Sequence, residues 1–127
     1  MNATTLFIFS GLPAVGKSTL AKSVVKNSGA VYLRIDTLEQ GLKDLCRISV
    51  VEGEGYRLAY RMASDNLKLN NNVVVDCCNP IELTRKEWED VAVKTDCRFV
   101  NIEVVCSDKA EHKQRAEIKT IKALTVL

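Results

Sequence analysis

Short apolar runs alternate with longer segments of helical periodicity along this chain. The runs at 6–9, 31–35, 73–75 and 98–106 are rich in β-branched and aromatic residues and predict four strands. The run Val73-Val-Val75 has no polar alternation, which is typical of a strand buried on both faces of a parallel sheet.

Between these runs, apolar residues recur every three or four positions, which predicts helices. The first helix opens at Thr19 and ends at Gly29, a residue suited to a left-handed cap. The last is a strongly charged helix from Asp108 to about Lys119, followed by a short apolar tail at 121–127. The other predicted helices cover 37–45, 56–69 and a segment opened by a capping box at 84–87.

Strands that alternate with helices predict one α/β domain with right-handed crossovers. The 127 residues are one domain's length, with 46% hydrophobic and 27% charged residues. Ligands on such sheets bind at the carboxyl ends of the strands. The segment 47–55 has little periodicity and two glycines, and we expect it to be a loop that moves over that site.

Charge and hydropathy exclude some partners. A formal charge of +2 gives no reason to expect a polyanionic partner, so binding to nucleic acid through bulk charge is disfavoured. There is no apolar run of the roughly 18 residues that span a bilayer, and no basic segment precedes the first apolar run. We therefore expect a cytoplasmic protein without a membrane partner. The apolar pattern does not separate core from interface, so the oligomeric state stays open.

Five cysteines at 46, 77, 78, 97 and 106 form no C-x-x-C pair, and His112 is the only histidine. This pattern fits neither a disulfide framework nor a zinc site. Reduced, mostly buried thiols are expected.

Residues 11–19 fit G-x-x-x-x-G-K-[ST], the phosphate-binding loop, between a predicted strand and a predicted helix. Glycines there allow positive φ and bring backbone N–H groups close to phosphate, and the helix N-terminus adds its dipole. Lys17 can reach the β- and γ-phosphates, the Ser18 hydroxyl can bind Mg²⁺, and Thr19 can contact the α-phosphate. The predicted nucleotide-binding residues are Gly11, Leu12, Pro13, Ala14, Val15, Gly16, Lys17, Ser18 and Thr19.

Two aspartates follow predicted strands and should converge with this loop at one rim of the sheet. Asp76, after the valine run, is placed as the Mg²⁺ carboxylate of a Walker B strand. Asp36 is then free to orient a hydroxyl and accept its proton. The alternative is that either aspartate only caps the helix that follows it.

Basic residues four apart on predicted helices have two interpretations. Arg115 and Lys119 share a face of the last helix and can close over the phosphates, or belong to a solvated surface. Arg57 and Arg61 can contact an anionic substrate, although a surface pair explains them as well.

The phosphate-binding loop, Asp36, Val73-Val-Val-Asp76 with Asn79-Pro80, and the segment from Ser107 to Arg115 together resemble small P-loop kinases. These form the AAA family ATPase-like group of kinases, which is similar to chloramphenicol phosphotransferase, gluconate kinase and polynucleotide 5′-kinase domains. The resemblance implies an adenylate-kinase-like α/β/α fold with a parallel sheet in the order 2-3-1-4, or 2-3-1-4-5 if a fifth strand exists. It also implies ATP and Mg²⁺ as cofactors, Asp36 as base, Asp76 as metal ligand and Arg115 as lid arginine.

Two features depart from that family. A second lid arginine is usual, and Lys119 stands in its place, which cannot make a bidentate phosphate contact. The family also continues into a further helix that contributes to the nucleotide base pocket, so either the adenine site is incomplete or a C-terminal segment is missing after Leu127; we expect the second.

The leading hypothesis is an ATP-dependent kinase that phosphorylates a hydroxyl of a small molecule. The alternatives are a kinase acting on a nucleic-acid 5′-hydroxyl and a nucleotide-binding regulatory module without transferase activity. An AAA-type motor needs an acidic residue after the Walker B aspartate, and Cys77 stands there.

Overall fold

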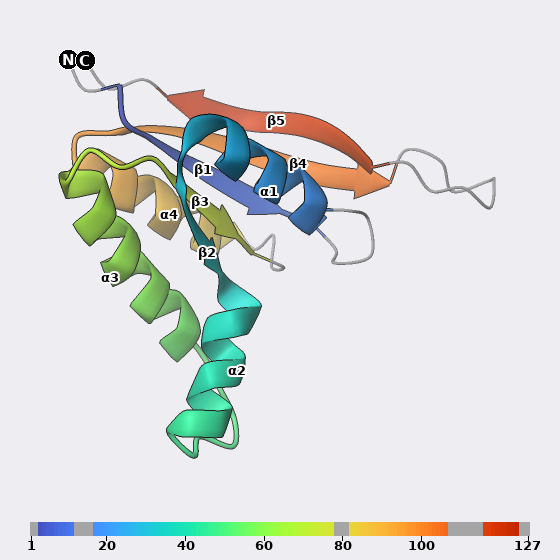
Figure 1. Ribbon diagram of the computed structural model, residues 1–127, viewed down its shortest axis with the longest axis vertical. Helices are drawn as coiled ribbons and strands as arrows, with labels where there is room; N and C mark the ends of the chain where they lie inside the picture. Colours follow the sequence, from blue (N-terminus) through green and yellow to red (C-terminus); the bar gives the residue numbers. More distant parts are fainter. Residues whose placement is uncertain (1–2, 12–16, 78–81, 107–115, 125–127) are drawn as a thin grey trace.

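The computed structural model describes residues 3–11, 17–77, 82–106 and 116–124 and is built on a five-stranded sheet (Figure 1). The strands lie in the order β2-β3-β1-β4-β5. The first four are parallel, which confirms the predicted order 2-3-1-4, and β5 runs antiparallel to β4. The strands are β1 (Thr5–Ser10), β2 (Val31–Arg34), β3 (Val73–Asp76), β4 (Arg98–Cys106) and β5 (Ala116–Leu124).

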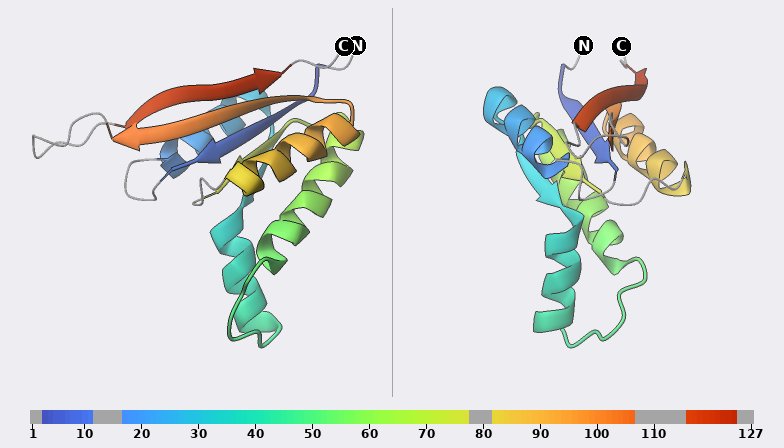
Figure 2. Two further views of the ribbon diagram at one scale, coloured as in Figure 1. Left: turned by 180° about the vertical axis from the view of Figure 1, so that it is seen from behind. Right: turned by 90° about the vertical axis from the view of Figure 1, so that its right-hand side faces the viewer.

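Helices cover both faces of the sheet (Figures 1 and 2). Helix α1 (Lys17–Ser28) lies on one face, and α3 (Glu54–Lys68) and α4 (Glu82–Lys94) lie on the other. Helix α2 (Ile35–Leu45) continues directly from β2 and packs with α3 as a hairpin that projects away from the sheet. The predicted three-layer α/β/α arrangement is therefore present.

Strand β3 explains why there are two apolar layers. All four of its residues are buried. Side chains alternate along a strand, so Val73 and Val75 join the cluster under α3 and α4, whereas Val74 joins the cluster under α1. Asp76 is next in this alternation and therefore belongs to the α1 face. The valine run thus buries two opposite faces and ends by placing a carboxylate beside α1.

The α3–α4 layer is held by aromatic and small side chains. Ala59, Ala63 and Leu67 lie buried along α3, as the predicted apolar face requires. Trp88 on α4 is fully buried, and its ring meets that of Tyr60 edge-on with centroids 4.5 Å apart. Such a contact adds directional packing to the burial of a large apolar surface.

Each of the four described helices begins earlier than predicted, α1 at Lys17 rather than at Thr19 and α3 at Glu54 rather than at 56. Strand β2 ends at Arg34, and α2 begins at Ile35 rather than at 37, so Asp36 lies in the first turn of a helix. Helix α4 begins at Glu82, so the predicted capping box at 84–87 lies inside the helix and does not start it. In α2, the buried side chain of Ile35 anchors the first helical turn, although the sequence pattern assigned this residue to the preceding strand.

The predicted helix at 108–119 is wrong in its last part, because Ala116 already belongs to β5. The β-branched residues Ile118, Thr120 and Ile121 suit a strand. The ladder shifts register beside Ile121, pairing Asn101 with Lys122 and Ile102 with Thr120. This irregularity interrupts the alternation that would have marked a strand. The predicted tail at 121–127 is likewise strand as far as Leu124.

Two connections can be compared with expectation. Gly29 has φ 67°, and its N–H donates to the Val25 carbonyl at 2.9 Å, which confirms the left-handed end of α1. Residues 46–53 link α2 to α3 at the tip of the hairpin, far from the sheet (Figure 1). They therefore do not cover the carboxyl rim, contrary to the prediction for this segment.

Within the described ranges, every helix is too short or too polar to cross a membrane.

Candidate active site

The predicted site residues surround the carboxyl ends of β1, β2 and β3. Gly11 follows β1, Asp36 follows β2 after one residue, and Asp76 ends β3. Lys17 and Ser18 open α1 on the far side of the loop. The parallel register pairs Phe9 and Arg34 with Asp76, so the three strands end at one level. Residues 12–16 and Arg115 lie outside the described residues.

Gly11 meets a steric requirement that only glycine satisfies. Its φ is 132°, a conformation that other residues rarely adopt. A Cβ at this position would stand 2.4 Å from the carbonyl oxygen of Val104 on β4. The positive φ is what the motif predicts for its first glycine, and the missing Cβ also lets the backbone pass close to the neighbouring strand β4.

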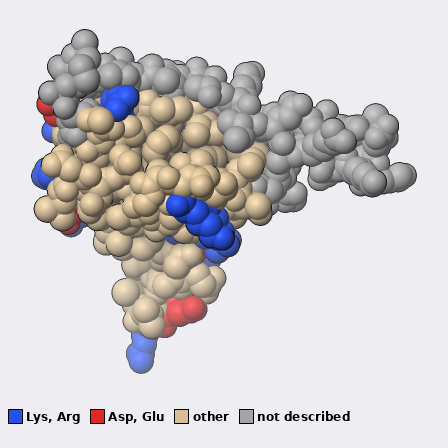
Figure 3. All heavy atoms as spheres, turned by 45° about the horizontal axis from the view of Figure 1, so that its top comes forward, with Lys and Arg blue, Asp and Glu red and all other residues tan. Residues whose placement is uncertain are grey.

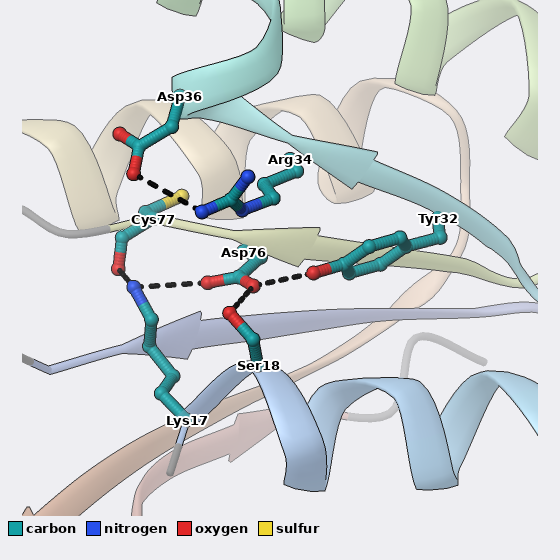
Figure 4. Close-up of polar contacts among 7 residues, drawn as sticks. All are labelled: Lys17, Ser18, Tyr32, Arg34, Asp36, Asp76 and Cys77. Atoms are coloured by element: carbon teal, nitrogen blue, oxygen red, sulfur yellow. Dashed lines mark hydrogen bonds and ion pairs between the residues drawn. The ribbon is translucent and has the colours of Figure 1, made fainter. Parts of the chain in front are cut away.

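Lys17 is buried, with 2% of its surface exposed. Its Nζ lies 2.9 Å from Asp76 Oδ1 and donates to the backbone carbonyl of Cys77 at 2.7 Å (Figure 4). The lysine and aspartate of the two motifs thus form a buried ion pair. A backbone carbonyl completes the environment of the ammonium.

The second oxygen of Asp76 accepts two hydroxyl donors. Ser18 Oγ donates to Oδ2 at 2.9 Å, and the Tyr32 hydroxyl donates to the same atom at 2.6 Å (Figure 4). Burial by itself raises the pKa of Asp76, but the hydrogen bonds from Tyr32, Lys17 and Ser18 and the charge of Lys17 outweigh it and lower the pKa. Burial and the bond to Asp76 raise the pKa of Tyr32 to about 12. The carboxylate is therefore ionised and the phenol protonated at neutral pH.

Tyr32 is the site residue that sequence reasoning missed. It lies on β2 two positions before the strand ends, on the α1 face shared with Val74. Its register partner is Val74, so its ring reaches diagonally to Asp76. Tyr32 could have been predicted from its position on the same face of the sheet as Asp76, but only if the pairing of β2 with β3 had been known.

The oxygen donors fit a hard cation. Ser18 supplies a hydroxyl and Asp76 a carboxylate, the kind of ligands that Mg²⁺ takes in nucleotide sites while keeping water and phosphate oxygens. The described part of the chain holds no cluster of three or more His, Cys, Asp or Glu side chains that could bind a metal. One carboxylate and one hydroxyl suffice when phosphates complete the coordination.

Asp36 lies at the same rim but outside the Lys17–Asp76 cluster. Its Oδ2 is 3.7 Å from Arg34 Nη2, and 43% of its side chain is exposed. Figure 4 shows Asp36 on the far side of Cys77 from Lys17. One turn further along α2, burial and the charge of Asp36 raise the pKa of Glu39. The candidate base is thus accessible to a substrate, next to a cluster that is itself buried.

Other predicted residues lie farther from this rim. Thr19 is exposed on the first turn of α1. Arg57 and Arg61 line a hollow of about 280 Å³ between α2 and α3, and Arg57 also lines one of about 300 Å³ between α3 and α4. On the face shown in Figure 3, the described Lys and Arg side chains form separate groups rather than one basic surface. Among the described cysteines, Cys46 is exposed and Cys77 and Cys97 are buried, and none of these three is in a disulfide.

Comparison with known proteins gives a family and a fold. The model of the AAA domain family matches residues 6–122. No curated protein matches the chain. Among solved structures, a presumed kinase from Chloroflexus aurantiacus is 17% identical, with a TM-score of 0.66 over 81% of this chain and 60% of that one.

Two further structures have the same fold. A chain of the Pnkp1/Rnl/Hen1 complex is 15% identical, with a TM-score of 0.69 over 98% of this chain and 46% of that one. The Mycobacterium tuberculosis APS kinase CysC is 22% identical, with a TM-score of 0.57 over 81% of this chain and 76% of that one. The chain thus spans 60% of the Chloroflexus protein and 46% of the Pnkp1/Rnl/Hen1 chain. It belongs to the AAA domain family and has the α/β fold of small P-loop kinases.

Proposed function

We propose that the protein is an ATP- and Mg²⁺-dependent phosphotransferase that moves the γ-phosphoryl group to a hydroxyl of a small molecule. The observation that carries this proposal is the meeting of Lys17, Ser18 and Asp76 in one hydrogen-bonded cluster, with Asp36 exposed beside it. Phosphoryl transfer needs charge neutralisation at the phosphates and a group that orients the acceptor. The cluster can supply the first and Asp36 the second.

In the proposal, Lys17 exchanges one anionic partner for another. Its ammonium leaves Asp76 Oδ1 and pairs with the β- and γ-phosphates at the N-terminus of α1. Mg²⁺, held by Ser18 and Asp76, supplies charge neutralisation across the phosphates when it is bound. The hydrogen bonds from Tyr32 and Ser18, which also lower the pKa of Asp76, do not depend on Lys17, so the carboxylate stays available to a cation after Lys17 leaves.

Asp36 acts on the acceptor. Its side chain lies in the first turn of α2, half exposed and outside the buried cluster. In a loose transition state the position of the acceptor hydroxyl matters more than the strength of the base. Asp36 therefore orients the acceptor hydroxyl and takes its proton as the acceptor oxygen bonds to the γ-phosphorus and the bond to the β,γ-bridging oxygen breaks, which releases ADP. Arg115 keeps its role as lid arginine as a prediction from the family resemblance.

A second candidate is a kinase acting on the 5′-hydroxyl of a nucleic acid, which the likeness to a chain of the Pnkp1/Rnl/Hen1 RNA repair complex brings into the test. The net charge of +2 and the scattered basic groups of Figure 3 favour a small acceptor instead. A regulatory module that binds nucleotide without transfer is the third candidate. Reduced cysteines at 46, 77 and 97 suit a reducing, cytoplasmic setting.

The test is transfer from γ-labelled ATP with Mg²⁺ to sugars, nucleosides, aminoglycoside and phenicol alcohols, and RNA 5′ ends. Asp36→Asn should lower transfer by about 10²- to 10⁴-fold while ATP affinity stays unchanged. Asp44→Asn is the matched control, because Asp44 lies exposed at the other end of α2, where it accepts from Gln40. It should transfer at the wild-type rate.

Each other outcome has a stated meaning. Nucleotide binding without transfer to any acceptor would favour the regulatory module. Loss of ATP binding in Asp36→Asn would remove Asp36 from the role of base. Wild-type ATP affinity in Lys17→Met would contradict the phosphate-binding role of the loop.

A further inference from the structure

We propose that Tyr32 is a positioning residue for the Mg²⁺ carboxylate, fixing Asp76 so that Oδ1 stays turned toward the phosphate site. This inference deepens the proposed function and rests on it. The Tyr32 hydroxyl donates to Asp76 Oδ2 at 2.6 Å, the shortest of the contacts made to that carboxylate (Figure 4).

The two oxygens of Asp76 have separate tasks. Oδ2 accepts from Ser18 and Tyr32, two neutral hydroxyls that come from α1 and β2. Oδ1 pairs with the Lys17 ammonium, which is the group that must move to the phosphates. When Lys17 leaves, Oδ1 becomes the oxygen that faces the incoming cation. Donors from two different elements on Oδ2 prevent the carboxylate from rotating at that moment.

The strand register makes this arrangement specific. Arg34 is the register partner of Asp76 on β2 and would be the obvious cation to pair with it. The structure places Arg34 on Asp36 instead, at 3.7 Å, and gives Asp76 the tyrosine from the diagonal position. Aromatic side chains are long enough to reach diagonal neighbours on a sheet. A serine or threonine at position 32 would be too short.

A neutral donor suits a metal ligand better than a cation does. Arginine on Asp76 would compete with Mg²⁺ for the negative charge of the carboxylate, whereas a hydroxyl orients the carboxylate and leaves that charge in place. The ring of Tyr32 also packs in the apolar cluster beneath α1, with Val74 and Ala21. The donor is therefore held on a rigid strand rather than on a loop.

Tyr32→Phe tests the proposal, because phenylalanine keeps the ring and removes only the hydroxyl. The measurement is ATP binding by calorimetry at a series of Mg²⁺ concentrations, and without Mg²⁺. We expect the Mg²⁺ concentration at half-saturation to rise about tenfold, the scale found when a partner of a metal ligand is removed. ATP affinity without Mg²⁺ should be unchanged. Equal loss of ATP affinity with and without Mg²⁺ would show a general packing defect and overturn the proposal.

Tyr60→Phe is the matched control. Tyr60 is also a half-buried tyrosine that hydrogen-bonds a carboxylate, that of Glu87, but it lies in the apolar cluster on the opposite face of the sheet. Its loss should leave the Mg²⁺ dependence of ATP binding at the wild-type value. An effect as large as that of Tyr32→Phe would mean that any buried tyrosine gives this result, and would overturn the proposal.

A double mutant separates positioning from indirect effects. In an Asp76→Asn background, Tyr32→Phe should cause no further change in Mg²⁺ dependence, because the hydroxyl acts through the carboxylate. Additive effects would contradict the proposal. If the wild-type protein binds ATP without any response to Mg²⁺, the proposed function itself fails. If ATP binding by the wild-type protein depends on Mg²⁺ and Tyr32→Phe shows the same dependence, only the proposed role of Tyr32 fails.

Discussion

Replacing Lys17 with methionine should cost folding free energy as well as nucleotide affinity. Lys17 and Asp76 are both almost fully buried, and their charged atoms are 2.9 Å apart. At an effective dielectric constant of about 20, this separation corresponds to about 6 kcal/mol of attraction. Methionine keeps most of the side-chain volume and leaves the aspartate buried without its cation.

The net loss should be smaller than the attraction. Ser18 and Tyr32 still donate to Asp76 in the variant, whereas breaking a buried pair by removing one partner costs about 3–5 kcal/mol. We expect the free energy of unfolding at pH 7 to fall by about 3 kcal/mol. With a urea dependence of about 1.5 kcal/mol/M, the unfolding midpoint should fall by about 2 M. Lys22→Met, on the exposed side of α1, should stay within about 0.5 kcal/mol of the wild type.

The pH dependence gives the sign of the effect. The folded-state pKa of Asp76 is lowered, so its stabilising contribution is present above its unfolded pKa of about 4 and is lost as pH falls through the folded value. The difference between wild type and Lys17→Met should therefore shrink below pH 4. The double variant Lys17→Met/Asp76→Asn should be more stable, by at least about 1.5 kcal/mol, than the sum of the two single losses predicts. Two results would refute the buried-pair argument: single losses that add strictly, or a Lys17→Met variant with the unfolding free energy of the wild type.

Three further changes should be measurable by thermal or urea unfolding. Gly11→Ala should destabilise by about 1–3 kcal/mol, because its Cβ would meet the Val104 carbonyl oxygen at 2.4 Å, and an unchanged melting temperature would contradict that close approach. Trp88→Ala should cost about 3–5 kcal/mol since Trp88 is fully buried, whereas the half-exposed Val93→Ala should cost under about 1 kcal/mol; similar losses in both would mean that the core is elsewhere. Because the folded-state pKa of Tyr32 is raised to about 12, its protonated hydroxyl contributes stability that is fully present below pH 10 and is lost as pH rises toward 12. Tyr32→Phe lacks this contribution and should lose less stability than the wild type over this interval. Parallel alkaline unfolding curves of the two proteins would rule the effect out.

The sequence predicts the parts of the site that local chemistry determines. Lys17, Ser18 and Asp76 follow from a contiguous motif and from a carboxylate at the end of a valine strand, and the structure brings all three together. Tyr32 does not follow, because its contact with Asp76 depends on pairing between β2 and β3. The Cys77 carbonyl that accepts from Lys17 leaves no sequence signal, since every residue carries that group.

The same distinction explains the C-terminal error. Charged residues three and four apart, such as Arg115 and Lys119, match a helix surface in sequence. A β-hairpin is decided instead by a partner strand, here β4, whose register with β5 is interrupted beside Ile121. Non-local pairing therefore overrode a local periodicity.

The direct passage from β2 into α2 makes the hairpin a lever. No loop residue separates Arg34 from Ile35, so the carboxylate of Asp36 is carried by the first turn of a helix whose other end lies at the projecting tip (Figure 1). A small tilt of α2 about this junction moves the tip far and Asp36 only slightly. A force applied at the tip therefore changes the orientation of Asp36 more easily than the same force applied near the sheet. The tip is the natural point to insert a reporter or a binding tag.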